Sequence, residues 1–144
     1  MSQVLESQWS SIKLEAKNLM SIVRQDNYLR HFGLDLGDET LDDWNTYPLR
    51  LFSADNPRYM ELCPLLSSIL KSHPEIISCM FSLMKAGKTI EPHVGPYDGL
   101  IRYQLALDIP KGECYLHVDN HIYYWTNGVG MVFDETFVHG AVNN

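Results

Sequence analysis

The stretch from Glu91 to Pro110 reads EPHVGPYDGLIRYQLALDIP, and its second half alternates apolar and polar side chains as a β-strand does. One face of this predicted strand is apolar and consists of Ile101, Tyr103, Leu105, Leu107 and Ile109. The opposite face carries Arg102, Gln104 and Ala106. Polar side chains on that second face predict that it lies at the surface or lines a wet cavity.

Further short strands are expected on both sides of this one. The alternation predicts strands over residues 76–84, 114–118, 122–125 and 131–133. Turns are predicted at Asp119-Asn120 and at Asn127-Gly128, where the residue types favour tight turns. Several short strands at this spacing, following two helices, predict a small antiparallel barrel or sandwich.

Two helices are expected before the strands. An apolar stripe with helical spacing predicts an amphipathic helix over residues 2–25, and it consists of Leu5, Trp9, Ile12, Ala16, Leu19 and Val23. Pro64 suits the first position of a second helix, which His73-Pro74 ends. Residues 26–57 between them are expected to be irregular, with a short strand over residues 49–52.

Two histidines lie in settings that suit metal ligation. A two-histidine, one-carboxylate iron site would place Asp or Glu two positions after the first histidine. Here the string is His93-Val94-Gly95, and the second histidine, His139, follows 46 positions after the first. The sequence therefore offers two imidazoles and leaves the expected third ligand position without a side chain.

The strings around these histidines resemble the aspartyl/asparaginyl β-hydroxylase family. In that family a His-x-Gly-Pro segment leads into a strand with an arginine, and a Phe-Asp-x-x-x-x-His segment follows some forty-odd residues later. Here EPHVGPYDGLIRYQLALDIP is followed by GVGMVFDETFVHGAVNN, residues 128–144. The resemblance is close over residues 79–144 and loose from Trp44, and residues 1–43 have no counterpart in it.

The resemblance implies a fold. It is a mainly β domain with N-terminal helices on its outer face, built as a double-stranded β-helix, also called a jelly roll or cupin-like fold. We expect one domain over residues 1–144, with a helical region over 1–75 and barrel strands over 76–144.

The resemblance also implies a cofactor site. His93 and His139 would bind Fe(II), 2-oxoglutarate would chelate the iron as cosubstrate, and water would fill the position beside Gly95. With O2, such a site hydroxylates an unactivated C–H bond. Ser82 and Arg102 match the family's residues for the carboxylates of cosubstrate or substrate.

The chain departs from the family pattern in two places. Gln104 stands where a histidine is common, although an amide can donate the same hydrogen bond. The family continues past the second histidine by a strand with an arginine, whereas this sequence ends five residues after His139. The sequence is then a fragment, or Arg102 does that work, or cosubstrate binding is impaired; we favour a fragment. A barrel without its last strand would expose an edge, which predicts weak stability or association.

Three functions stay open at this point. The first is hydroxylation of the β-carbon of an Asp/Asn-type substrate, either a small molecule or a peptidyl residue, or of an acyl chain. The second is an iron halogenase, because a vacancy at Gly95 would admit chloride to the metal. The third is a jelly roll that binds a carboxylate without catalysis.

Other candidate residues favour ordinary structural roles. His31 and His73 are expected at the surface, and His117 and His121 beside a solvated hairpin turn. Asp134 is expected to cap the Asp134-Glu135-Thr136 turn and not to bind metal. The three tryptophans are expected in the core, and they are Trp9, Trp44 and Trp125.

The bulk composition limits the partners. The 18 acidic and 11 basic residues give a formal charge of −7, which disfavours nucleic acids and anionic membrane surfaces. Three widely spaced cysteines form no disulfide framework, and a reducing compartment is the simplest interpretation. With no apolar leader or membrane span in the sequence, we expect a cytoplasmic protein.

Overall fold

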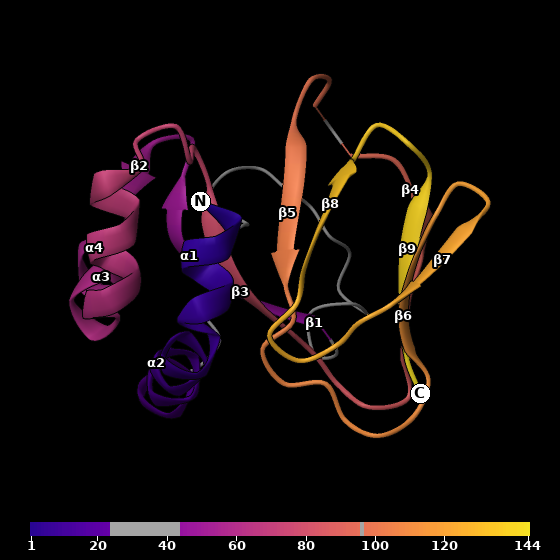
Figure 1. The fold of residues 1–144 in the computed structure, drawn as a ribbon, viewed down its shortest axis with the longest axis horizontal. Helices are drawn as coiled ribbons and strands as arrows, with labels where there is room; N and C mark the ends of the chain where they lie inside the picture. The colour runs from indigo at the N-terminus through magenta and orange to yellow at the C-terminus, as the bar shows by residue number, and fades with distance from the viewer. Residues whose placement is uncertain (24–43, 96) are drawn as a thin grey trace. The chain divides into compact units, whose positions relative to one another are not determined.

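The computed structural model describes residues 1–23, 44–95 and 97–144 (Figure 1). The chain divides into two compact units. One unit combines Met1–Trp9 with Lys85–Asn144 and carries most of the strands. The other unit, Ser10–Met84, carries most of the helices. The single domain over residues 1–144, divided after residue 75, stays a prediction.

The predicted N-terminal helix is present but interrupted. Helix α1 spans Ser2–Ser7 and helix α2 spans Trp9–Ile22, with Gln8 as the C-cap of α1. The predicted apolar stripe is confirmed, since its aliphatic members are buried: Leu5, Ile12, Ala16, Leu19 and Val23. The irregular region predicted from residue 26 lies outside the described residues up to residue 43.

Two short helices follow in the same unit as α2. Helix α3 spans Pro57–Leu62 and α4 spans Pro64–Ser72, and the predicted start at Pro64 is confirmed. Both carboxylate oxygens of Glu15 in α2 accept hydrogen bonds at the start of α4, from the amides of Leu65 at 2.6 Å and Leu66 at 3.0 Å. A carboxylate there satisfies amides that have no partner within the helix and favours the positive end of its dipole.

A three-stranded antiparallel sheet completes the Ser10–Met84 unit. Its order is β2-β1-β3, with β1 over Trp44–Leu51, β2 over Ala54–Asp55 and β3 over Cys79–Met84. The strand predicted over residues 49–52 was too short, because β1 begins five residues earlier. The strand predicted over residues 76–84 begins at Cys79.

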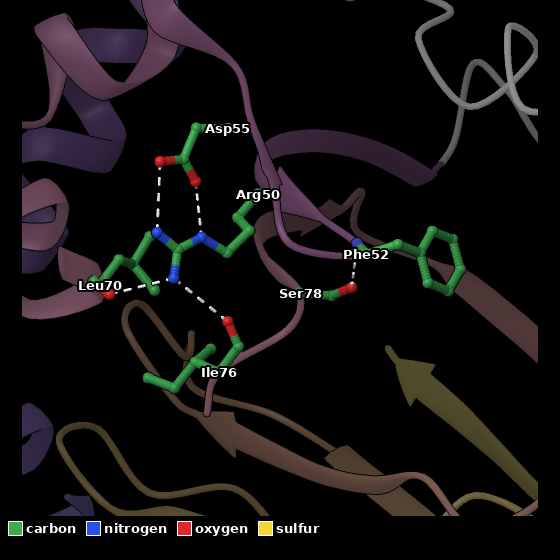
Figure 2. Close-up of polar contacts among 6 residues, drawn as sticks. All are labelled: Arg50, Phe52, Asp55, Leu70, Ile76 and Ser78. Carbon is green, nitrogen blue, oxygen red and sulfur yellow. Dashed lines mark hydrogen bonds and ion pairs between the residues drawn. The ribbon is translucent and has the colours of Figure 1, made fainter. Parts of the chain in front are cut away.

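Arg50 of β1 ties this sheet to the helices of its unit (Figure 2). Its Nε and Nη2 donate to the two carboxylate oxygens of Asp55, at 2.5 and 3.2 Å. Its Nη1 donates to the carbonyl oxygens of Leu70, at 3.0 Å, and Ile76, at 3.3 Å. All three guanidinium nitrogens are therefore used, which is how a buried arginine avoids an unsatisfied charge.

The other unit holds two antiparallel sheets. The first has the order β4-β9-β6-β7, with strands Lys88–His93, His139–Asn143, Cys114–Val118 and His121–Tyr124. The second pairs β5, Ile101–Leu105, with β8, Gly130–Asp134. A mainly β fold with antiparallel sheets and helices is confirmed.

The sequence did not predict β4 and β9. Strand β4 contains Pro92 and two charged residues, and β9 contains Gly140, so neither shows the alternation that marks a strand. Strand β9 nevertheless lies between β4 and β6 and is paired on both sides. Residues after His139 therefore form an inner strand of their sheet.

Two expectations about burial were wrong. Ile101, on the apolar face of β5, is 66% exposed, whereas Ala106 on the opposite face is buried. None of the three tryptophans is fully buried. Trp44 shows the reason, since its indole Nε1 donates a hydrogen bond of 2.5 Å to Ser82 Oγ. Indole N–H groups commonly stay at a polar boundary in this way.

Two further expectations concern cysteines and membrane spans. All three cysteines are free, in agreement with the absence of a disulfide framework. Burial raises the pKa of the Cys63 thiol to about 12. Among the helices in the described ranges, none is both long and apolar enough to cross a membrane.

Candidate metal and carboxylate site

Strands β4 and β9 bring the two candidate ligands together. His93 is the last residue of β4 and His139 the first residue of β9, and the antiparallel register places them opposite each other. Their ring centroids lie 4.4 Å apart, with an angle of 53° between the rings. The β4–β9 register shifts between Ile90 and His93, just before this pair. A pair 46 positions apart in sequence thus becomes one cluster of imidazoles.

Both imidazole rings are oriented in the same way. His93 Nδ1 lies 2.8 Å from the carbonyl oxygen of Glu91, and His139 Nδ1 lies 2.9 Å from that of Phe137. Because a carbonyl oxygen can only accept, Nδ1 donates in each ring. Each Nε2 then carries the lone pair, which is the tautomer that metal-binding histidines use.

The two histidines differ in exposure. His93 is exposed, whereas His139 is 6% exposed and lies against the Phe133 ring at a centroid distance of 5.2 Å. Burial lowers the pKa of His139, and the hydrogen bond to the Phe137 carbonyl oxygen opposes that shift in part. A neutral imidazole is the form that can bind a metal ion.

The described residues supply two candidate metal-binding side chains to this cluster, the imidazoles of His93 and His139. Within residues 1–23, 44–95 and 97–144, no group of three or more His, Cys, Asp or Glu side chains could hold a metal ion. The two Nε2 atoms suit a divalent transition metal whose remaining positions are taken by other ligands. This donor set fits Fe(II) with a chelating cosubstrate.

Arg102 is paired with a carboxylate that the sequence reasoning did not single out. Its Nε donates to Glu135 Oε2 at 2.8 Å, and its Nη2 donates to the same oxygen. The Glu135 side chain is 3% exposed and the Arg102 side chain 39% exposed. Strand β8 ends at Asp134, one residue before Glu135, and Arg102 faces Phe133 of β8 in register.

Glu135 also occupies the space beside Gly95. A side chain at position 95 would place its Cβ 2.7 Å from Glu135 Cγ and 2.8 Å from Cδ. The Gly95 amide donates to the Glu135 carbonyl oxygen at 2.7 Å. A third ligand at position 95 is therefore excluded sterically while Glu135 keeps this conformation.

The turn after β8 confirms the predicted capping role of Asp134. It also contains Glu135, whose burial the sequence did not predict. Asp134 Oδ1 accepts from the Thr136 amide at 2.9 Å and from the Thr136 hydroxyl at 2.7 Å, so it caps the turn as expected. These hydrogen bonds lower the pKa of Asp134. Glu135 follows directly, and a charged residue in a turn gives no sequence signal that it is buried.

Gln104 lies on the same face of β5 as Arg102. Its Oε1 is buried and has no hydrogen-bond partner among the described residues. Buried amides are normally satisfied, and an amide can present either its oxygen or its NH2 group to a neighbour. This unpaired amide oxygen, two residues from Arg102 in the sequence, is a polar atom that a bound ligand could satisfy.

The other candidate residues are Ser82 and the four remaining histidines. Ser82 belongs to the other unit, where its hydroxyl is engaged by Trp44, and its cosubstrate role stays a prediction. His73 pairs with Glu75 at 2.9 Å, and His121 is exposed at the hairpin. His117 is half-buried, and His31 lies outside the described residues.

Comparison with known proteins gives one family match that covers every residue of this site. A family described as Aspartyl/Asparaginyl beta-hydroxylase matches residues 6–144, so the expectation that residues 1–43 have no counterpart in the family was wrong for residues 6–43. The ornithine lipid ester-linked acyl 2-hydroxylase of Rhizobium tropici is 30% identical over 103 residues, covering 70% of this chain and 37% of that protein. The aspartyl/asparaginyl beta-hydroxylase of Homo sapiens is 28% identical over 145 residues, covering 94% of this chain and 18% of that protein.

A further relative shows the same partial coverage. The aspartate beta-hydroxylase domain-containing protein 2 of Homo sapiens is 28% identical over 145 residues, covering 96% of this chain and 38% of that protein. The chain thus spans less than two fifths of the length of each of these relatives.

Proposed function

Since this chain belongs to the aspartyl/asparaginyl β-hydroxylase family, we propose that it is an Fe(II)- and 2-oxoglutarate-dependent hydroxylase. One observation carries the proposal: two imidazoles with centroids 4.4 Å apart, each with Nδ1 on a carbonyl oxygen and Nε2 left for a metal. The nearby Arg102, although paired with Glu135, supplies the guanidinium N–H donors that a carboxylate ligand needs.

Each residue of the cluster has a role in this proposal. His93 and His139 hold the iron, and their backbone hydrogen bonds keep both rings in the metal-binding tautomer. Arg102 orients a carboxylate of cosubstrate or substrate through its N–H donors, and Gln104 does so with its amide turned so that the NH2 group faces the ligand. The iron centre supplies the chemistry, in which R–H, O2 and 2-oxoglutarate become R–OH, succinate and CO2. The carboxylate-binding role of Ser82 rests on the family resemblance alone.

The proposal extends to fold and substrate. We propose that the β4-β9-β6-β7 and β5-β8 sheets are the two faces of a double-stranded β-helix. Relatives are named for aspartyl/asparaginyl hydroxylation and for 2-hydroxylation of an ester-linked acyl chain. Candidate substrates are therefore Asp/Asn side chains and acyl chains, with the protein acting in the cytoplasm.

Hydroxylation is favoured over halogenation by the surroundings of Gly95. The halogenase hypothesis needs free space there for chloride, but Glu135 fills the space beside the Gly95 backbone. A buried carboxylate at that place also repels an anion. Product analysis with chloride or bromide present tests this point, because a halogenated product would refute the hydroxylase proposal.

The direct test is anaerobic loading of the full chain with Fe(II) and 2-oxoglutarate. We expect the metal-to-ligand charge-transfer absorption of the chelate, and its loss in His93→Ala and in His139→Ala. His121→Ala, which removes an exposed imidazole from the hairpin, is the matched control and should keep the band. Absence of the band in the wild-type protein would leave the carboxylate-binding module as the function.

Succinate release then tests catalysis. Aspartyl peptides, asparaginyl peptides and ester-linked acyl lipids are compared for succinate formation above the background without substrate. Stimulation by one class with formation of its hydroxylated product identifies the substrate. A chelate band with no hydroxylated product from any class would contradict the proposed reaction.

A further inference from the structure

We propose that Glu135 is a specificity-determining residue that limits Arg102 to a single carboxylate and rejects phosphate-type dianions. The inference rests on the proposed function only in that Arg102 is taken to bind a ligand anion. It concerns the two members of one ion pair, and the histidines play no part in it.

The guanidinium of Arg102 has two edges that can bind a carboxylate, and Glu135 occupies one of them. Nε and Nη2 both donate to Glu135 Oε2, which uses the side edge of the group. Nη1 has no partner among residues 1–23, 44–95 and 97–144. The end edge, formed by Nη1 and the second Nη2 hydrogen, therefore remains for one planar carboxylate.

The Arg102 side chain is 39% exposed, whereas that of its partner Glu135 is 3% exposed. Arg102 is thus anchored by a buried carboxylate while more than a third of its own side-chain surface is accessible to solvent. An arginine held in this way loses little conformational freedom when it binds an anion.

Glu135 is held in place and cannot easily give way to a ligand. Its side chain is 3% exposed, and its Cγ and Cδ lie against the Gly95 backbone. Its carbonyl oxygen also accepts the Gly95 amide at 2.7 Å. A ligand anion must therefore bind with the Glu135 charge still present.

The charge balance gives the selectivity. Arg102 and Glu135 together are neutral, so an incoming anion gains one guanidinium edge and is repelled by a carboxylate just behind it. Because the pair is neutral, it offers little net attraction to offset the cost of taking the head group out of water, and that cost grows with the square of the head-group charge. A carboxylate has one negative charge, whereas a phosphate monoester has nearly two above about pH 7. Phosphate-type head groups are consequently disfavoured.

The test uses two probes, butyrate and propyl phosphate, which differ mainly in head group. The full chain without iron is labelled with 15N, and the Arg102 Nε–H resonance, assigned by its absence in Arg102→Lys, is followed at pH 7.5. We expect butyrate to shift the wild-type resonance in a saturable way, and propyl phosphate to leave it unchanged at the same concentration.

The decisive variant is Glu135→Gln, which keeps the shape of the side chain and removes its charge. We expect butyrate to bind about tenfold more tightly, which corresponds to about 1.4 kcal/mol of removed repulsion, and we expect propyl phosphate to bind as well. Glu113→Gln removes one negative charge at an exposed position and should leave both titrations unchanged.

Several outcomes would overturn the inference. They are wild-type protein that binds both probes equally or neither, and Glu135→Gln with wild-type selectivity. If Glu135→Gln does not unfold cooperatively, Glu135→Asp replaces it, because that variant keeps the charge. Glu135→Asp must retain the preference for butyrate, and a gain of propyl phosphate binding would also overturn the inference. No iron or turnover enters these titrations, so loss of the chelate band would refute the proposed function separately.

Discussion

Arg50 and Arg102 each bind a carboxylate, but the two pairs are built in opposite ways. In the Ser10–Met84 unit the arginine is buried, with 10% of its side chain exposed, and its partner Asp55 is 37% exposed. In the other unit the carboxylate of Glu135 is 3% exposed and Arg102 is 39% exposed. In the first pair the arginine is the buried member, and in the second pair the carboxylate is the buried member.

The use of the guanidinium donors separates the two arginines further. All three nitrogens of Arg50 are engaged, two by Asp55 and one by carbonyl oxygens (Figure 2). Arg102 donates from Nε and Nη2 to one oxygen of Glu135, and its Nη1 has no partner among the described residues. A saturated, buried arginine stabilises a fold, whereas an unsaturated, accessible arginine is available to a ligand.

Removal of Arg50 should have the largest effect on stability. Arg50→Ala leaves the carbonyl oxygens of Leu70 and Ile76 and the Asp55 carboxylate without their donor, which we expect to cost about 3 kcal/mol. Urea denaturation measures the loss as a lower midpoint. Arg58→Ala, at an exposed position in α3, is the control and should change stability by less than about 0.5 kcal/mol. Equal losses of stability in Arg50→Ala and Arg58→Ala would contradict the stabilising role of the Arg50 hydrogen bonds.

Gly95→Ala tests how tightly the second pair is enclosed. The new Cβ would lie 2.7 Å from Glu135 Cγ, and we expect a loss of about 2 kcal/mol in the free energy of unfolding, as overpacking gives. In a Glu135→Ala background the same change should cost less, because the side-chain clash is gone. A double-mutant cycle of unfolding free energies measures this coupling, and additive effects would show that Glu135 moves aside freely.

Matched Arg→Lys substitutions test the difference between the two arginines most directly. Arg102→Lys keeps a charge for Glu135, so we expect less than about 1 kcal/mol of lost stability but about tenfold weaker carboxylate binding. Arg50→Lys should lose about 2 kcal/mol of stability, since one ammonium cannot replace three engaged nitrogens, and leave binding unchanged. Butyrate titration measures the change in binding, and urea denaturation measures the change in stability. A binding loss in Arg50→Lys together with a stability loss in Arg102→Lys would contradict the roles given to the two arginines.

The smallest effect should be the pH dependence of the Arg50–Asp55 pair. The hydrogen bond from Arg50 lowers the pKa of Asp55 below its ordinary value of 3.8. The pair therefore contributes stability above that value and loses it as the pH falls through the lower pKa of the folded state. Because Asp55 is partly exposed, the contribution is at most about 1 kcal/mol. The stability difference between wild type and Asp55→Asn should shrink below about pH 3.8, and a difference independent of pH would contradict this origin.

Strong local patterns in the sequence were sufficient for much of the fold. The 3.6-residue spacing of Leu5, Ile12, Ala16 and Leu19 identified a helical face that is buried, and Pro64 marked the start of α4. The alternation over residues 114–118 identified β6 at its observed bounds. Strands β4 and β9 were missed because pairing with neighbours, and not their own composition, makes them strands.

The residues of the candidate site were also predicted only in part from the sequence. The strings around His93 and His139 identified the family, which the match over residues 6–144 confirms, and they named Arg102 and Gln104 as site residues. They did not identify Glu135, since nothing in Asp134-Glu135-Thr136 distinguishes a capping acid from a buried one.

By itself, the sequence determined the family, the antiparallel β class and the residues of the candidate metal and carboxylate site, because these follow from local spacing and short motifs. Only the tertiary structure decided that the imidazoles meet at 4.4 Å and that Glu135 fills the space beside Gly95. The reason is physical: burial and ion pairing depend on which strands become neighbours, and residues distant in sequence determine that together.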